Sequence, residues 1–316
     1  MRTLLLLLIS LACATSALAQ YPSKAISIIV PLAPGGGTDL LARVIADKLR
    51  DKLGQPVTVE NRSGAAGNIG ADAVFKAPPD GHTLLFTQPA PLVVNKALYG
   101  KLTFEPEQFV PIAVVSIQDI MLAVNPGVPA TNLQELIAHA RANPGKLNFG
   151  SSGAGSAPHL AAELFSSMAG VKMVHVPYKG SGESQAATLA GHVDMTFFAF
   201  STALRHTKAG KLRAIGVGGT KRNAQAPEVP AISEVLPGYS AASWTALVAP
   251  PGTSAAVAQT LAGAVSEILK MPDVRKRLVD AGDEPADITG AQMAAFLREE
   301  RQRWSEVIRA AGITAQ

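Results

Sequence analysis

The stretch VPLAPGGGTDLLAR, from Val30 to Arg43, decides how the rest of the sequence is interpreted. It overlaps a β-branched apolar run, Ala25–Pro31, and its three glycines lead into residues with the apolar spacing of a helix. A strand, a glycine-rich turn and a helix in this order commonly bind an anion. The first backbone N–H groups of a helix lack partners within the helix, and that end is electrostatically positive. The stretch therefore predicts an anion site.

Residues 1–19 have the features of a secretory signal peptide. Arg2 precedes the apolar run Leu4–Ala12, and Ala17-Leu18-Ala19 matches an A-x-A cleavage signature. The run is too short to span a membrane. We therefore expect export to the periplasm with cleavage after Ala19. The alternative is lipidation at Cys13, which Ser10 disfavours because an aliphatic residue is expected at that position.

Composition narrows the classes of function. Cys13 is the one cysteine, so the mature chain has no disulfide and no thiol nucleophile. The hydrophobic content of 47% in 316 residues allows a large core and two domains. The net charge of +4 is mild, and no cluster of basic residues indicates a nucleic acid partner. These features fit an exported, monomeric binder of small anions.

From Lys24 onward, apolar strands alternate with amphipathic helices, which is typical of parallel sheets covered by helices on both faces. The expected strands are Ala25–Pro31, Val57–Glu60, Thr83–Thr87, Leu147–Gly150, Met173–Val176, Val193–Phe198 and Leu212–Val217. The expected helices begin near Thr38 and cover Ala71–Lys76, Leu133–Arg141, His159–Met168, Glu183–Ala190, Ala255–Lys270, Asp273–Ala281 and Gln292–Ala310.

Two segments indicate that the chain passes between domains. Ile112–Val124 is unusually long and apolar, with an interruption around Ser116–Asp119, and Trp244–Ala249 resembles a returning strand. We therefore predict two doubly wound α/β domains, with the second inserted into the first. Residues 20–120 and 223–316 form domain 1, and residues 121–222 form domain 2. In such folds the ligand cleft lies at the carboxyl ends of the strands, between the domains.

Three glycine-rich loops precede helices, at Pro34–Asp39, Ser63–Gly70 and Ser151–Ser156. The third loop adds serine hydroxyls to the backbone donors. None of the three contains lysine or arginine, which favours recognition through amides, hydroxyls and water. A single loop of this kind is as often only a turn. Loops at equivalent positions in two domains favour binding.

Five segments share their order and spacing with a known family: VPLAPGGGTDLLAR, VENRSGAAGNIGADAVFKAPPDGHTLL, LNFGSSGAGSAPHLAAELF, VPYKGSGESQAATLAGHVDM and LRAIGVGGTKR. Through them the sequence resembles the Bug (TctC-type) receptors of tripartite tricarboxylate transporters, from about Tyr21 to the C-terminus. It implies a type II periplasmic-binding-protein fold that closes on a small carboxylate, with one glycine turn from each domain holding the carboxylate.

The loops and the resemblance together define a candidate site. From domain 1 it takes Pro34, Gly35, Gly36, Gly37, Thr38, Asp39, Ser63, Gly64, Ala65 and Gln88. From domain 2 it takes Ser151, Ser152, Gly155, Ser156, His159, Tyr178, Lys179 and Asp194.

Several of these roles have alternatives. Asp39 would repel an anion and is better placed as a helix cap, and His159 could serve as a cap or surface residue. Asp194 is expected to form hydrogen bonds across the cleft or to accept one from an ammonium group of the ligand. Gly37 departs from the family pattern, and its role is open.

Phe197, Phe198 and Phe200 also depart from the family pattern. If Phe200 faces the cleft, the ligand has an apolar or aromatic body. The alternative, which we favour, is that these rings belong to the core.

Enzyme functions find little support in the sequence. The first glycine turn ends on Leu40 where a dinucleotide site needs a third glycine, and no phosphate-binding loop motif occurs. Ser152 lacks the flanking glycines of a nucleophile elbow. The six histidines show no metal-binding spacing, so we expect neither metal nor cofactor.

The sequence therefore predicts a binding protein rather than an enzyme. It would capture a di- or tricarboxylate, an acidic amino acid or an aromatic acid and deliver it to membrane transporter subunits. The alternative is a component that presents the same ligand to a membrane histidine kinase.

Overall fold

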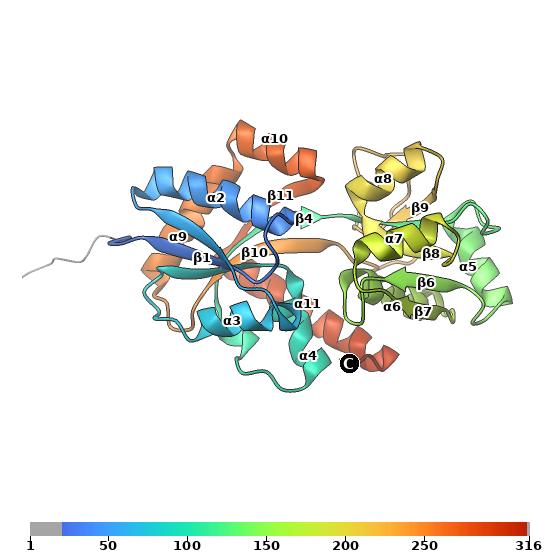
Figure 1. The fold of residues 1–316 in the computed structure, drawn as a ribbon, viewed down its shortest axis with the longest axis horizontal. Helices are drawn as coiled ribbons and strands as arrows, with labels where there is room; N and C mark the ends of the chain where they lie inside the picture. The colour runs from blue at the N-terminus through green and yellow to red at the C-terminus, as the bar shows by residue number, and fades with distance from the viewer. Residues whose placement is uncertain (1–20, 315–316) are drawn as a thin grey trace, which may run out of the picture.

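The computed structural model describes residues 21–314, and the expected leader with its cleavage after Ala19 lies outside them. Figure 1 shows two α/β domains side by side. The first part of the chain forms β1 (Ile26–Val30), α2 (Gly37–Leu53), β2 (Val57–Asn61), η1 (Ala65–Gly67), α3 (Asn68–Phe75), β3 (Thr83–Thr87), η2 (Ala90–Val94), α4 (Asn95–Tyr99), η3 (Pro106–Gln108), β4 (Val110–Gln118) and β5 (Ile120–Val124). The remainder forms α5 (Leu133–Ala142), β6 (Asn148–Ser151), α6 (Ala157–Ala169), β7 (Val174–Pro177), α7 (Ser181–Leu189), β8 (Met195–Ala199), α8 (Phe200–Lys208), β9 (Arg213–Val217), η4 (Ile232–Glu234), β10 (Ser243–Ala249), α9 (Ala255–Leu269), α10 (Pro272–Ala281), β11 (Asp283–Thr289) and α11 (Gly290–Ala311).

The sheet of domain 1 has the strand order β11-β4-β10-β3-β1-β2. Each strand contributes side chains to two cores, because successive side chains of a strand point to opposite faces of the sheet. Ile28 and Val30 of β1 pack with α2 and α9, whereas Ile29 belongs to the core that contains α3 and α11. Helices therefore cover both faces of the sheet, as the apolar strands predict.

The sheet of domain 2 has the order β7-β6-β8-β5-β9. Here Leu122 faces the core that includes α5 and α6, and Met121 faces the core formed with α8. The parallel pairing expected from the alternation of strands and helices holds for part of each sheet. Strands β1, β2 and β3, and strands β6, β7 and β8, pair in parallel, but β5, β10 and β11 pair antiparallel with their neighbours because the chain changes direction on crossing between domains.

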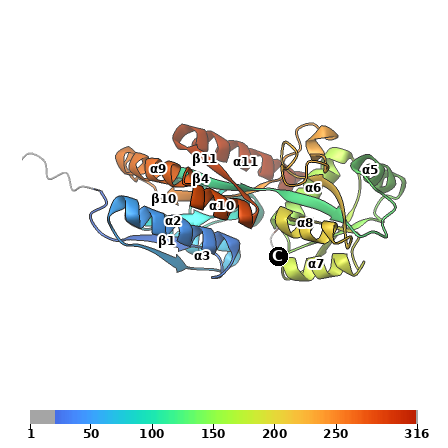
Figure 2. The ribbon, with the colours of Figure 1, turned by 90° about the horizontal axis from the view of Figure 1, so that it is seen from above.

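The chain crosses between the domains at two places. Asp119 alone separates β4 from β5, and β10 returns to domain 1 (Figure 2). Before this return, Ala226, Val229 and Ala231 pack in the core of domain 2, and Tyr239 donates its hydroxyl to the Ala161 carbonyl. This packing places the return crossing closer to Ser243 than to residue 223.

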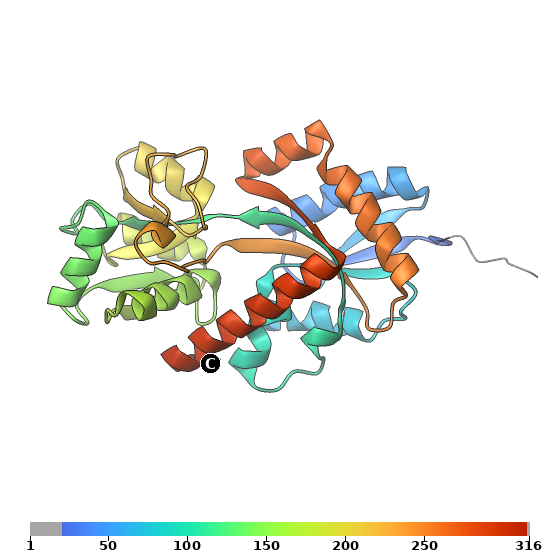
Figure 3. The ribbon, with the colours of Figure 1, turned by 180° about the vertical axis from the view of Figure 1, so that it is seen from behind.

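Helix α11 links the domains further, because it begins on domain 1 and packs against α6 of domain 2 (Figure 3). Near its middle, Glu300 is buried, and its Oε2 accepts hydrogen bonds from the indole N–H groups of Trp244 at 2.9 Å and Trp304 at 3.2 Å. Its Oε1 pairs with Arg303. The contact fixes α11 to the strand β10 that crosses between the domains.

Candidate functional site

The glycine turn before α2 is anchored by its own carboxylate. Gly35 has a φ of +83°, and its N–H donates to Asp39 Oδ2 at 2.9 Å. Asp39 Oδ1 also accepts from Arg43 at 3.0 Å and from Asn61 at 2.9 Å. Burial raises the pKa of Asp39, but the hydrogen bonds from Arg43, Gly35 and Asn61 outweigh burial and hold that pKa below its ordinary value. Asp39 is thus an ionised anchor of the turn.

The N–H groups that come next point out of the helix end. Helix α2 begins at Gly37 after the N-cap Gly36, and no side chain of residues 21–314 caps it. Gly36 has a φ of −75°, which any residue adopts, and a Cβ there would come no closer than 3.8 Å to the Ala33 carbonyl. A Cβ on Gly37 would meet no atom within 4 Å. These two glycines therefore leave space at the helix end.

The serine turn before α6 is anchored by histidine side chains instead of a carboxylate. Ser151 is buried, and its hydroxyl lies 2.6 Å from His175 Nε2. Gly155 has a φ of +73°, and its N–H donates to His159 Nδ1 at 3.0 Å. The rings of His159 and His175 stack with centroids 3.8 Å apart. Burial, together with His159, lowers the pKa of His175 to about 4, so this ring is uncharged at neutral pH.

Two adjoining hollows of about 280 Å³ and 150 Å³ form the cleft between these turns. Gln88, Gln118 and Ser243 line both. The larger is also lined by Pro89, Ala90, Val94, Ile120, Ser152, Gly155, Ser156, Ala157, Pro158, Leu160, Ser181, Phe197, Ala199, Ala241, Ala242 and Trp304. The smaller is also lined by Gly37, Thr38, Leu41, Trp244, Thr245 and Asp283.

Helix N-termini from both domains converge on this cleft. Gly37 and Thr38 begin α2, Ala157 begins α6, Ser181 begins α7, and Ala199 precedes α8. None of these four helices receives a side-chain cap from the described residues. Their first N–H groups and the positive ends of their dipoles favour a bound anion.

The lining of the cleft carries almost no charge. Among the described residues that line it, none is lysine, arginine or histidine, and Asp283 is the one acid. Ile120, Leu160 and Phe197 supply an apolar wall in the larger hollow. An anion would therefore be held by backbone N–H groups, hydroxyls and amides rather than by an ion pair.

The residues predicted from sequence fall into three groups. Gly37, Thr38, Gln88, Ser152, Gly155 and Ser156 line the cleft, and Gln88 Nε2 donates to Thr38 Oγ1 at 3.0 Å. A second group lies in these turns, in the first turn of the helices that follow them, or in the loop between β7 and α7, without lining either hollow: Pro34, Gly35, Gly36, Asp39, Ser151, His159, Tyr178 and Lys179. A third group, Ser63, Gly64 and Ala65, lies in an exposed loop before α3 and lines neither hollow.

Asp194 does not reach the cleft. It precedes β8, and its Oδ2 accepts the N–H of Asn148 at 2.8 Å, at the start of β6. The cleft lies at the carboxyl ends of these strands, beyond Ser151 and Ala199. Asp194 lies at their opposite, amino-terminal ends. We therefore leave Asp194 out of the site.

The phenylalanine segment divides between core and cleft. Phe200 is fully buried in the core of domain 2 with Met121 and lines neither hollow, as the favoured interpretation predicts. Phe197 is also buried but contributes to the wall of the larger hollow. Its alternation with Phe198, which faces the other core, follows from the period of a strand.

Sequence reasoning missed most of the apolar lining and several residues with polar groups, among them Gln118, Ser181, Ser243, Asp283 and Trp304. A signal existed for two of them. Gln118 interrupts the apolar run of the first crossing, and Ser243 begins the second, so both mark the point where the chain passes the cleft. Asp283 belongs to β11, which the sequence pattern did not predict.

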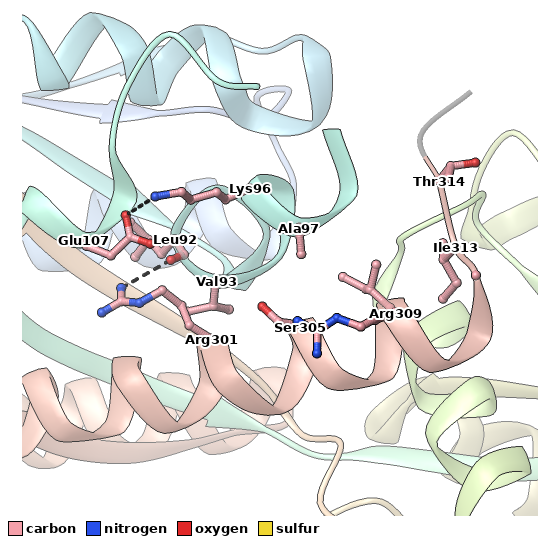
Figure 4. A pocket seen from close by; sticks show the side chains of 12 residues that line it. Leu92, Val93, Lys96, Ala97, Glu107, Arg301, Ser305, Arg309, Ile313 and Thr314 are labelled. Carbon is pink, nitrogen blue, oxygen red and sulfur yellow. Dashed lines mark hydrogen bonds and ion pairs between the residues drawn. The ribbon is translucent and has the colours of Figure 1, made fainter. Parts of the chain in front are cut away.

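Another hollow of about 510 Å³ lies apart from the cleft, between α11 and the η2–α4 segment (Figure 4). Three of its four charged side chains, Lys96, Glu107 and Arg301, have protein partners. Lys96 pairs with Glu107 at 3.0 Å, and Arg301 donates to the Leu92 carbonyl at 3.4 Å. It contains no glycine turn of the kind that precedes α2 or α6, so we assign the candidate site to the cleft.

Residues 21–314 lack two further features. No three histidine, cysteine, aspartate or glutamate side chains come together as metal ligands. No helix in that range has both the length and the apolar character needed to cross a membrane.

Two α/β domains with a ligand-sized cleft at the carboxyl ends of their strands define a solute-binding receptor. The family model described as "Tripartite tricarboxylate transporter family receptor", TctC, matches residues 41–313, and the chain belongs to this family. The expected family and the type II periplasmic-binding-protein fold are thereby confirmed. The family consists of binding proteins, which also agrees with the expectation that the chain is not an enzyme.

Relatives cover nearly the whole chain. Protein BugT of Bordetella pertussis is 37% identical over 92% of this chain and 90% of its own length. A structure of an R. palustris protein with adipate has a TM-score of 0.79 and 34% identity, covering 93% of this chain and 99% of that one. A structure of MatC from Rhodopseudomonas palustris with bound malate has a TM-score of 0.74 and 32% identity, covering 91% and 100%.

Proposed function

We propose that this receptor captures a small carboxylate in the cleft between its domains. The observation that carries the proposal is the convergence of four uncapped helix N-termini from both domains on a cleft whose described lining lacks basic side chains. A carboxylate would accept hydrogen bonds from the first N–H groups of these helices and from the hydroxyls of Ser152 and Ser156. These contacts compensate its loss of hydration without an ion pair.

The relatives support the chemical class. The two R. palustris structures are described with adipate and with malate, both dicarboxylates. For this chain we infer a small carboxylate, with di- and tricarboxylates, acidic amino acids and aromatic acids as the candidates. The apolar wall formed by Ile120, Leu160 and Phe197 would contact the carbon skeleton of the ligand.

Binding would be coupled to closure of the domains. The connections at Asp119 and before Ser243 let one domain rotate against the other. A ligand that touches both turns stabilises the closed form by the contacts which that form alone provides. The closed receptor would then deliver the carboxylate to the membrane subunits of a tripartite transporter.

The two tryptophans provide a direct test. Trp304 lines the larger hollow and Trp244 the smaller, so ligand binding should change their fluorescence. The protein without its leader would be titrated with malate, adipate, glutamate and benzoate, and with a neutral sugar as the control. At a ligand concentration of 100 times Kd, the free energy of unfolding should rise by about 2.7 kcal/mol. A response to the sugar with none to any carboxylate would contradict the proposal.

We also propose that the leader is removed on export. Mass spectrometry of the protein recovered from the periplasm should show an N-terminus at Gln20. A lipid-modified N-terminus at Cys13 would instead support the lipoprotein alternative.

A further inference from the structure

The smaller hollow of the cleft contains one carboxyl group, that of Asp283. Asp283 is the first residue of β11 and pairs with Gln118 on β4, which pairs in turn with Ser243 on β10. The three residues therefore lie side by side at the edge of the sheet that faces domain 2. Asp283 is 7% exposed and lines the hollow together with Thr38, at the start of α2.

Few interactions compensate the cost of burying the Asp283 carboxyl group. Burial raises the pKa of Asp283 to about 6, and a hydrogen bond from Ser116 offsets only part of that rise. No cation among residues 21–314 contributes to its electrostatics. Asparagine would fill the same space without a charge, so stability alone does not account for an aspartate here. A buried, unpaired carboxyl group in a cleft is typical of a functional residue.

The two hollows therefore favour opposite groups of a ligand. The larger hollow has no charged lining residue among those described, and it receives the N-termini of α6 and α7, which favour an anion. In the smaller hollow the negative charge of Asp283 counteracts the start of α2. Gln88, Gln118 and Ser243 line both hollows, so one ligand can extend from the first into the second.

We propose that Asp283 selects carboxylic acids whose far end carries a hydrogen-bond donor, a hydroxyl or ammonium group, and rejects acids with a second carboxylate at that end. This inference rests on the proposed function, because it places the ligand's one carboxylate in the larger hollow. The ligand class is then a hydroxy- or amino-carboxylic acid. The donor contacts Asp283, and the carbon chain lies along the apolar wall.

Acids of equal chain length that differ in one terminal group test this assignment. One series is hexanoate, 6-hydroxyhexanoate, 6-aminohexanoate and adipate, and a shorter series is butyrate, 4-hydroxybutyrate, 4-aminobutyrate and succinate. In calorimetric titrations near neutral pH, the wild type should bind the hydroxy or amino acid at least tenfold more tightly than the dicarboxylate of the same length. Tighter binding of the amino acid or of the hydroxy acid shows which donor is preferred.

The substitution Asp283→Asn should reverse this order. The amino acid should lose at least tenfold in affinity, and the dicarboxylate should gain, because the repelling charge is removed. Asp280→Asn is the matched control, since Asp280 is exposed on α10 and lines neither hollow, and it should keep the wild-type order. Circular dichroism and melting curves establish that each variant is folded.

Two results would overturn the role of Asp283. One is a wild type that binds each dicarboxylate as tightly as the matching hydroxy and amino acids. The other is an Asp283→Asn variant with the wild-type order. If the wild type binds none of the eight acids, nor the carboxylates named under the proposed function, the proposed function fails instead, so the two failures are distinguishable.

Discussion

The two turns on either side of the cleft are stabilised by the same kind of hydrogen bond, but the acceptor side chains differ in their chemistry. In each, a glycine with a positive φ donates its N–H to the side chain four residues later, in the first turn of the following helix. Gly35 donates to Asp39 before α2, and Gly155 donates to His159 before α6. The acceptor in domain 1 is an ionised carboxylate balanced by Arg43, whereas the acceptor in domain 2 is an imidazole stacked on His175.

The two glycines also differ in their surroundings. A Cβ on Gly155 would come within 2.3 Å of Leu98 Cδ2, in helix α4 of domain 1, whereas a Cβ on Gly35 would meet nothing within 4 Å. Both glycine N–H groups are used to fix the turn and are not free for a ligand. The donors available to a ligand are therefore the N–H groups that come next, at the start of each helix.

Removal of the charged anchor should have the largest effect. Asp39→Ala leaves the Gly35 N–H and the Asn61 amide without their acceptor and leaves Arg43 unpaired. We expect a loss of about 3 kcal/mol in the free energy of unfolding, measured by urea denaturation. Asp47→Ala on the same helix is the control, because its exposed pair with Arg50 contributes less than about 1 kcal/mol. Equal losses in the two variants would show that Asp39 does not anchor the turn.

The two glycines with positive φ should differ in the cost of an added methyl group. Gly35→Ala requires an unfavourable backbone conformation and should destabilise the protein by about 1 kcal/mol. Gly155→Ala adds the contact with Leu98 to the same backbone cost, and we expect about 2–3 kcal/mol. In a double-mutant cycle, Gly155→Ala should cost less in a Leu98→Ala background than in the wild type. An equal cost in both backgrounds would mean that the contact between the domains does not restrict Gly155.

The sequence was sufficient to predict the α/β units and the crossings, because local patterns determine them. An apolar run as long as Ile112–Val124 does not fit within one domain of this size, and the structure divides it at Asp119. Strand β11 was not predictable in this way. Asp283–Thr289 contains Pro285 and no apolar alternation, and it becomes a strand only by pairing with β4.

The site was predictable where position along a strand decides it. Ser151 ends its strand and Gln88 follows one, and both lie at or beside the cleft. Asp194 precedes its strand and lies at the opposite end of the sheet's strands. Strand direction alone contains this information. The hydrogen bonds from Gly35 to Asp39 and from Gly155 to His159 depend on side-chain conformation, so the sequence did not reveal which N–H groups are already occupied.

As the pH falls, the turn before α6 should lose its contribution to stability at a higher pH than the turn before α2. The pKa of His175 is about 4 in the folded protein and about 6.5 in an unfolded chain, so protons bind preferentially to the unfolded state between these values. Stability should fall as the pH decreases from about 6.5 to about 4, on the order of 1 kcal/mol because the ring is only half-buried. Asp39 has a lowered pKa, so its contribution is lost only below its unfolded pKa of about 3.9.

Asp283 acts in the opposite direction over part of this range. Its raised pKa of about 6 makes the folded state bind protons preferentially, so its cost to stability disappears as the pH falls below 6. The effect of His175 is therefore measured as the difference between the wild type and His175→Gln at each pH, in which the contribution of Asp283 cancels. A difference that stays constant from pH 7 to pH 4 would contradict the role given to the neutral ring.

The smallest effects on stability should come from substitutions of Gly36 and Ser152, whose side-chain positions face open space at the two turns. Gly36→Val fits an extended backbone with φ of −75° and has no atom near its Cβ except the Ala33 carbonyl at 3.8 Å. Ser152→Ala removes a hydroxyl that lines the larger hollow. Each variant should change the free energy of unfolding by less than about 0.5 kcal/mol.

Affinity for the carboxylate should respond to both substitutions even though stability does not. Valine places a branched side chain at the start of α2, beside Gly37 and Thr38 of the smaller hollow, where it would obstruct the far end of the ligand. We expect a loss of affinity of about tenfold or more. Ser152→Ala should cost about three- to tenfold for a single hydroxyl. Calorimetric titration with the best carboxylate measures both. Because fold stability is unchanged, a loss in one variant alone would show that the ligand uses a single turn, and unchanged affinity in both would place the carboxylate elsewhere in the cleft.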